Sequence, residues 1–121
     1  MKRNTNESGA VAPFEETPLF RQFQHLKRQV REGTILFIRL GDFYETFKHD
    51  AQMVSAVCEV AQSMRGGVPM AGVPCHAIDR FVSKLVKAGY AVALAEQTED
   101  AMPRKRGTVC RREISRIVKE N

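Results

Sequence analysis

The sequence predicts a single α/β domain in which a mixed sheet is flanked by about three helices. The chain of 121 residues is the size of one domain. Segments with helical periodicity alternate with short β-branched and aromatic segments. Hydrophobic residues make up 43% and charged residues 27%, as in ordinary globular proteins. We expect a flexible leader over residues 1–16, the folded domain over 17–118 and a C-terminal end over 119–121.

The first helix is predicted just after the leader, which is polar and aperiodic. Thr17 is a suitable N-cap, and Pro18 occupies the first helical position, where its missing N–H costs nothing. We expect the helix to run to about Arg31 and to stop at Gly33. Five apolar residues at helical spacing form its core-facing stripe, namely Leu19, Phe20, Phe23, Leu26 and Val30.

A β-hairpin is predicted next. Residues 34–40 (TILFIRL) are β-branched and aromatic with almost no polar interruption, which is typical of a central strand covered on both faces. Gly41 and Asp42 supply turn chemistry, and residues 43–47 (FYETF) resume strand-like composition.

Alternation along this second strand divides its side chains between two faces. Phe43, Glu45 and Phe47 share one face, while Tyr44 and Thr46 share the other. On alternation alone, both phenylalanines are expected in the core.

The rest of the chain completes the fold through hydrophobic periodicity and Gly/Pro punctuation. In order, we expect a helix opening near Asp50, a short strand before Arg65, a Gly/Pro-rich loop with a short extended piece over 65–74, a helix over 76–90 ending at Gly89, a buried strand over 90–97, a loop over 98–108 and an arginine-rich edge strand over 109–118.

The net charge of +5 is concentrated at the C-terminal end. Residues 101–121 contain seven basic and two acidic residues, so this segment carries the whole excess and the first hundred residues are balanced. Such a segment is suited to binding phosphates, but it is equally typical of a solvated tail that maintains solubility. No apolar segment could serve as a membrane span or signal peptide, which indicates a cytoplasmic protein.

Several kinds of enzyme site are disfavoured. The three cysteines, Cys58, Cys75 and Cys110, are widely spaced and form no close pair of the kind that zinc sites or disulfide frameworks use, so we expect no metal. The phosphate loop and the dinucleotide fingerprint are both absent. Cys75 and His76 are neighbours, but extended backbone points adjacent side chains apart, which favours structural roles.

Four carboxylates leave a nuclease open as an alternative. If the fold brought them together, they could hold Mg²⁺ for phosphodiester cleavage. Nothing in their spacing requires this convergence. The four residues are Asp42, Glu45, Glu96 and Asp100.

Four motifs resemble the N-terminal mismatch-recognition domain of the MutS family. They are RLGDFYETF, PMAGVPCHA, KLVKAGYAVALAEQ and the final RIV, and they occur in the family's order across residues 17–118. The resemblance implies a non-enzymatic mixed α/β domain that binds mispaired duplex DNA and cooperates with other mismatch-repair components. It also implies no cofactor here, because the family's ATP site lies in other domains.

The resemblance also implies site residues. The F-x-E motif that enters the DNA minor groove at a mispair would be Phe43 and Glu45, which reverses the core assignment of Phe43. Arg112 falls where the family carries a basic residue near the DNA. We include Asp42 and Arg106 in the expected DNA-binding set.

Two departures from the family pattern stand out. The stretch SMRGGVPMAG is shorter than usual, and Cys75 replaces a common aromatic residue. The connector, lever, clamp and ATPase of full family members do not occur in these 121 residues. The sequence therefore predicts a mismatch-sensing DNA-binding module, with an accessory protein-interaction module as a second candidate.

Overall fold

The computed structural model describes residues 13–98 and 109–120. Within them, three α-helices and two short 3₁₀ helices accompany one mixed six-stranded sheet, which confirms the predicted fold class. The elements are η1 (Phe14–Glu16), α1 (Pro18–Lys27), β1 (Ile35–Leu40), β2 (Phe43–Phe47), α2 (Lys48–Cys58), β3 (Ser63–Arg65), β4 (Val68–Pro74), η2 (Cys75–Ala77), α3 (Ile78–Lys87), β5 (Val92–Gln97) and β6 (Arg112–Val118).

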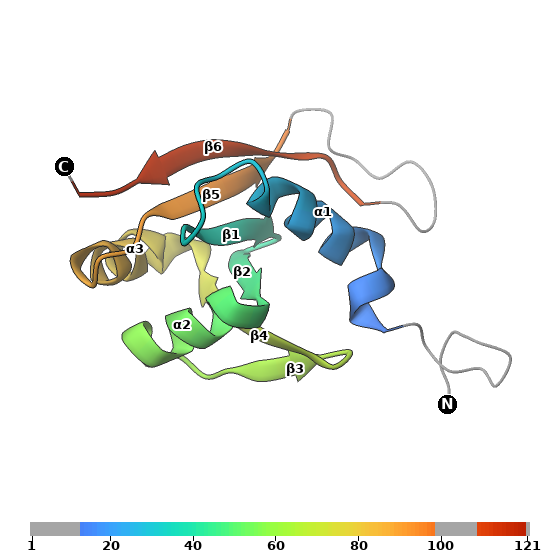
Figure 1. Cartoon of the computed structure of the whole chain (residues 1–121), viewed down its shortest axis with the longest axis horizontal. Coiled ribbons are helices and arrows are strands. Elements are labelled where there is room, and N and C mark those ends of the chain that lie inside the picture. Colours follow the sequence, from blue (N-terminus) through green and yellow to red (C-terminus); the bar gives the residue numbers. More distant parts are fainter. Residues whose placement is uncertain (1–12, 99–108, 121) are drawn as a thin grey trace, which may run out of the picture.

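The strand order of the sheet is β3-β4-β2-β1-β5-β6. β1 runs parallel to β5, and every other pairing is antiparallel. The hairpin β1–β2 therefore lies in the middle of the sheet, and the central position predicted for residues 34–40 is confirmed by β1. Figure 1 shows β6 at the top and β3 at the bottom, so the expected edge position of the arginine-rich strand is confirmed.

Strand β1 has a hydrophobic layer on each face. Ile35 and Phe37 pack with α2 and α3, whereas Leu36 and Ile38 pack with α1. All four side chains are at most 1% exposed. A strand buried on both faces needs a continuous apolar sequence rather than an alternating one, and this is what residues 35–38 provide.

Helix α1 ends at Lys27, one turn earlier than the predicted end near Arg31. Beyond Lys27 the backbone tightens, because the N–H groups of Gln29 and Val30 bond to carbonyls three residues back. The Lys27 ammonium donates to the carbonyl of Thr34 at 2.6 Å and so ties the helix end to the entry of β1. Val30, predicted as the last residue of the apolar stripe, lies beyond the helix and is only partly buried.

The predicted flexible leader is wrong for its last residues. Phe14–Glu16 form η1, and Phe14 is 5% exposed with its ring 5.0 Å from that of Phe47 and 5.5 Å from that of Phe20. Local composition could not reveal a partner cluster that lies elsewhere in the chain. Residues 1–12 lie outside the described part.

The Gly/Pro-rich stretch 65–74 is mostly strand rather than loop. β3 and β4 form a hairpin whose turn residues, Gly66 and Gly67, have φ values of 53° and 87°, as a type I′ turn requires. At Gly66 a Cβ would also lie 2.7 Å from the Cβ of Phe14. Pairing of β4 with both β2 and β3 overrides the weak strand propensity of its sequence.

None of the helices in the described residues is long and apolar enough to cross a membrane. The helix predicted over 76–90 is α3, preceded by one 3₁₀ turn and followed by Gly89 at φ 102°. The buried strand predicted over 90–97 is β5.

Candidate nucleic-acid interface

The β1–β2 hairpin brings Asp42, Phe43 and Glu45 together at one end of the sheet. Gly41 and Asp42 form a two-residue turn, and Gly41 has φ 60°, a conformation that glycine adopts without strain. Phe43 is 47% exposed, a large fraction for a phenylalanine in a paired strand. Its ring is therefore accessible from solvent.

Burial increases along the same face of β2. Glu45 is half-buried, and Phe47 is fully buried against the rings of Phe14, Phe20 and Phe23. The cause is that η1 and α1 cover only the Phe47 end of this face. The other face is buried at Tyr44 and Thr46, so the strand that carries Phe43 is packed against the core on that side.

The carboxylate of Glu45 lies across β4 towards β3. A Cβ at Gly72 would meet Glu45 Cγ at 3.3 Å, so the glycine leaves space for this side chain. Arg65 Nη1 lies 3.5 Å from Glu45 Oε1, and the Arg65 guanidinium also sits 5.0 Å from the Phe14 ring centroid. Burial raises the pKa of Glu45 above its ordinary value, and Arg65 offsets part of that rise.

Neighbouring groups hold the hairpin turn in place. Arg39 Nε donates to the carbonyl of Gly41 at 2.6 Å, and the backbone N–H of Cys75 donates to the carbonyl of Asp42 at 2.8 Å. Phe43 itself pairs with Leu40 on β1 and Pro74 on β4. The turn is thus bonded on both sides, while no element in residues 13–98 or 109–120 covers the Phe43 ring.

The structure does not bring Arg112 to this surface. Arg112 is 7% exposed, and its guanidinium donates to the Arg39 carbonyl at 2.8 Å, to Gln22 Oε1 at 2.7 Å and to the Cys110 carbonyl at 3.2 Å. Burial lowers its pKa. These contacts are internal, so we leave Arg112 out of the interface. Arg106 lies outside the described residues.

Of the four carboxylates considered for Mg²⁺, the three that the structure describes do not converge on a metal site. Among the described residues, no group of three His, Cys, Asp or Glu side chains could hold a metal ion. Glu96 instead accepts a hydrogen bond from Tyr44 and pairs with Arg39 at 3.4 Å. Asp100 lies outside the described residues. The three cysteines are free thiols.

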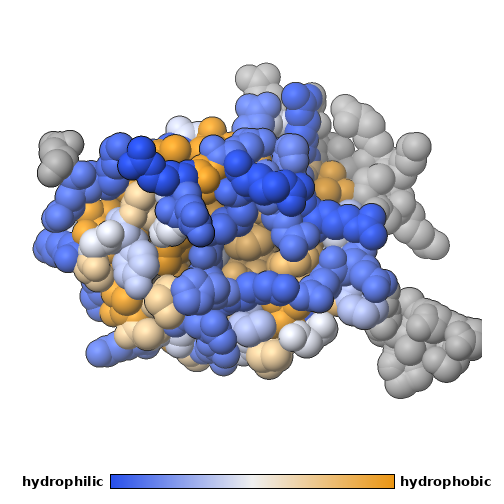
Figure 2. Space-filling model, in the orientation of Figure 1, coloured by the Kyte–Doolittle hydropathy of each residue, from blue (hydrophilic) through white to orange (hydrophobic). Residues whose placement is uncertain are grey.

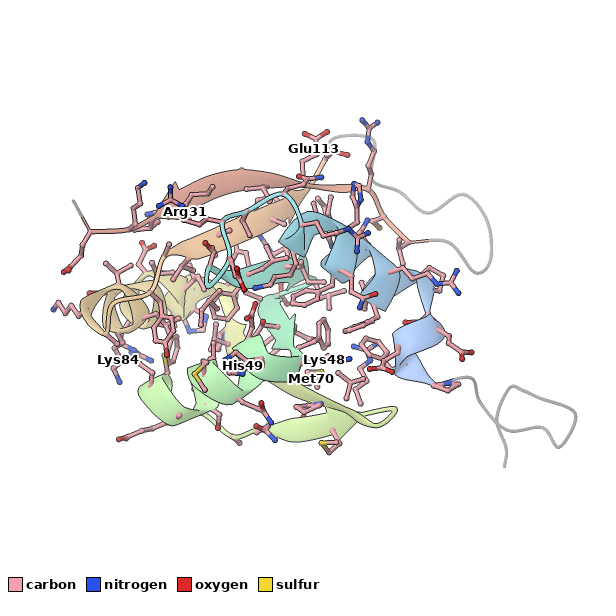
Figure 3. The ribbon with its side chains drawn as sticks, viewed as in Figure 1. Arg31, Lys48, His49, Met70, Lys84 and Glu113 are labelled. Carbon is pink, nitrogen blue, oxygen red and sulfur yellow. The ribbon has the colours of Figure 1, made fainter. Side chains whose placement is uncertain are left out.

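A groove of about 480 Å³ lies between α1 and the start of α2, and neither Phe43 nor Glu45 lines it. On this face Figure 2 shows hydrophobic residues in the gaps between hydrophilic ones, and Figure 3 shows Lys48 and His49 at the start of α2. Asp50, on its wall, accepts from the Leu36 N–H at 3.0 Å and pairs with Lys27 at 3.0 Å. These bonds tie α2 to β1 and α1, which is a structural role.

Sequence reasoning missed Arg65, Arg39 and Tyr44 as neighbours of the hairpin. The Gly-Gly pair after Arg65 is a turn signal that could have placed this arginine at the end of a hairpin strand. The contacts of Arg39 and Tyr44 with Glu96 join strands more than fifty residues apart in sequence. No local pattern carries that information.

Comparison with known proteins places this arrangement in a family. The family model described as MutS domain I matches residues 17–120. DNA mismatch repair protein MutS from Thermotoga maritima is 45% identical over 102 residues, which cover 84% of this chain and 12% of the relative. The MutS of Desulfitobacterium hafniense is 46% identical over 112 residues, covering 88% of this chain and 13% of the relative. The MutS of Thermosipho melanesiensis is 42% identical over 102 residues, again 84% of this chain and 12% of the relative.

The chain thus spans about an eighth of the length of these relatives. The matched region contains every described strand and α-helix, with the exposed Phe43 and the half-buried Glu45 on the central hairpin. On the family match and the identities, this chain belongs to the MutS domain I family.

Proposed function

We propose that this domain binds duplex DNA and senses mispaired or otherwise deformable base steps. Phe43 acts as a wedge that enters the minor groove, and Glu45 bonds to the base that the wedge displaces. The domain carries out no catalytic step in this proposal. Its partners are mismatched DNA and other repair components.

The observation that carries the proposal is the 47% exposure of Phe43 on a firmly held hairpin. A phenyl ring stacked on a base contributes about 1–3 kcal/mol. Opening and kinking a base step costs a few kcal/mol. At a matched pair the cost of opening the step exceeds the stacking energy gained by the ring, so insertion is unfavourable. A mispair is already weakly stacked and flexible, so the cost is lower and insertion becomes favourable. Discrimination then arises from DNA deformability and needs no base-specific code.

Glu45 is an unusual residue to place beside phosphates. Its raised pKa gives it a greater share of the protonated form than an exposed glutamate has. A protonated carboxyl group can donate to a purine N7, and an ionised one can accept from a ring N–H. Proximity to DNA phosphates would raise the pKa further, because negative charges disfavour the carboxylate.

Duplex binding tests the proposal. A labelled duplex with one G·T mispair and its matched homoduplex are compared at low salt, for the parent and for Phe43→Ala. We expect the parent to prefer the mispair. In the variant, the ratio of mispair affinity to homoduplex affinity should fall by about 5- to 150-fold, which corresponds to about 1–3 kcal/mol of lost stacking. Its weaker non-specific binding should remain.

Ile117→Ala is a matched control, because Ile117 is 53% exposed on the edge strand β6. This variant should keep the preference of the parent. If the parent binds neither duplex, the accessory protein-interaction module becomes the better function. Mg²⁺-dependent cleavage of the duplex would favour the nuclease.

A further inference from the structure

We propose that Arg39, Tyr44 and Glu96 form a positioning cluster that keeps the Phe43 hairpin rigid while a base step is opened. The inference rests on the proposed function and adds three residues to it. None of the three needs to touch DNA, so they are positioning residues. Each comes from a different strand, namely β1, β2 and β5.

The cluster is joined by three kinds of contact. The Tyr44 hydroxyl donates to Glu96 Oε2, and Arg39 Nη1 lies 3.4 Å from Glu96 Oε1. The Arg39 guanidinium also lies 5.7 Å from the Tyr44 ring centroid. One carboxylate thus holds a phenol and a guanidinium at once, and it does so from a strand that does not belong to the hairpin.

The cluster reaches the wedge by two routes. Tyr44 directly follows Phe43 and is 6% exposed on the opposite face of β2, so a tilt of the Phe43 backbone would displace the phenol from Glu96. Arg39 Nε donates to the Gly41 carbonyl at 2.6 Å, which fixes the turn itself. Arg39 and Tyr44 form the strand pair next to the one that closes the turn, and both are therefore linked to β5.

The backbone of Arg39 is held from a third direction. The buried Arg112 donates to the Arg39 carbonyl at 2.8 Å and to Gln22 Oε1 at 2.7 Å. In this way β6 and α1 hold the end of β1 that precedes the turn. Arg112 thus stabilises the hairpin through contacts inside the protein.

Rigidity matters for a wedge because the ring gains stacking energy only where it stays between the bases. A turn that yields would let the base step close again at little cost. The side chains of Arg39 and Glu96 are 35% and 32% exposed, and ion pairs this exposed add little to global stability. A positioning role therefore accounts better for a cluster at the rim of the sheet than a contribution to stability does.

Amide hydrogen exchange in the free protein tests whether the cluster holds the turn. The variants are Tyr44→Phe, which removes one hydroxyl, and Glu96→Gln, which removes the charge but keeps an acceptor. The matched control is Tyr90→Phe, because the Tyr90 hydroxyl contacts the sulfur of Met53 at 3.2 Å, away from the turn. The reporter amide is that of Cys75, bonded to Asp42, and the core reference is that of Leu36, bonded to Asp50.

We expect Tyr44→Phe to speed exchange at Cys75 roughly tenfold while Leu36 is unchanged, since local opening exposes only the turn. Glu96→Gln should give a smaller increase, and Tyr90→Phe none at Cys75. The mispair preference, measured as for Phe43→Ala, should fall in the same order, with non-specific affinity retained. A purely stabilising role would instead speed exchange at both amides.

The outcomes separate this inference from the proposed function. Unchanged exchange at Cys75 in Tyr44→Phe overturns the cluster as a positioning device, whatever the DNA results. Faster exchange with a full mispair preference shows that the cluster holds the turn but that sensing does not need it, which also overturns the inference. A parent without any mispair preference refutes the proposed function, and the exchange data then decide alone whether the cluster fixes the turn.

Discussion

Phe43 and Phe47 lie on the same face of β2, yet Phe43 is 47% exposed and Phe47 is completely buried. Only three residues of one strand separate a ring open to solvent from a ring enclosed by three other phenylalanines. Truncating the two side chains should therefore have very different effects on the free energy of unfolding.

Phe47→Ala should lower the free energy of unfolding by about 3–5 kcal/mol, because it leaves a cavity among aromatic rings. Phe43→Ala should change it by no more than about 0.5 kcal/mol, as an exposed substitution does. Urea denaturation followed by circular dichroism measures both. A large loss of stability in Phe43→Ala would mean that this ring supports the fold, against its observed exposure.

Thr46→Val should stabilise the protein by about 1 kcal/mol. The Thr46 hydroxyl is buried, with no hydrogen-bond partner in the described structure, and valine fills the same space without the unsatisfied oxygen. Thr17→Val serves as the matched control with the opposite sign. Thr17 caps α1 by accepting from the Phe20 N–H, so its loss should cost about 1 kcal/mol. Equal effects of the two variants in thermal unfolding would contradict the prediction.

Glu45→Gln should change how stability depends on pH. The pKa of Glu45 is raised in the folded state, so the folded protein binds this proton more tightly than the unfolded chain does. The free energy of unfolding of the parent should therefore fall as pH rises from the ordinary value of 4.5 through the raised one. The glutamine variant has no such proton to lose, so its free energy of unfolding should increase relative to that of the parent as pH rises above 4.5 in urea titrations.

The pKa of the Glu45 carboxyl group also tests its ion pair with Arg65. Arg65→Gln should raise the pKa of Glu45 further, since the guanidinium that favours the carboxylate is gone. Carbon-detected NMR titration of the free protein measures this pKa directly. An unchanged pKa in the variant would mean that the pair at 3.5 Å does not persist in solution.

Arg112→Met should destabilise the fold by about 2–4 kcal/mol, because three partly buried acceptors lose a buried charged donor. Arg111→Met is the neighbouring control. The Arg111 side chain is 64% exposed and paired with Glu113, so this change should cost less than about 1 kcal/mol. If Arg112→Met instead kept full stability and reduced the salt dependence of DNA binding, Arg112 would be a phosphate contact after all.

Periodicity and turn chemistry in the sequence determined much of the fold. The apolar run 35–38 required a strand buried on both faces, and Gly41 with Asp42 required a tight turn after it. Alternation grouped Phe43, Glu45 and Phe47 on one face. These features were predictable because they depend on residues that are neighbours in the chain.

Tertiary structure decided which of these side chains are covered. Phe47 is buried because η1 and α1 reach it, and Phe43 is exposed because they do not. From the sequence, the positive charge of Arg112 suggested a contact with DNA phosphate. In the structure its guanidinium instead donates hydrogen bonds inside the protein to groups from β1 and α1. The physical reason is the same in each case. Burial and hydrogen bonding depend on contacts between distant segments, and the local pattern of a sequence does not specify which distant segment arrives.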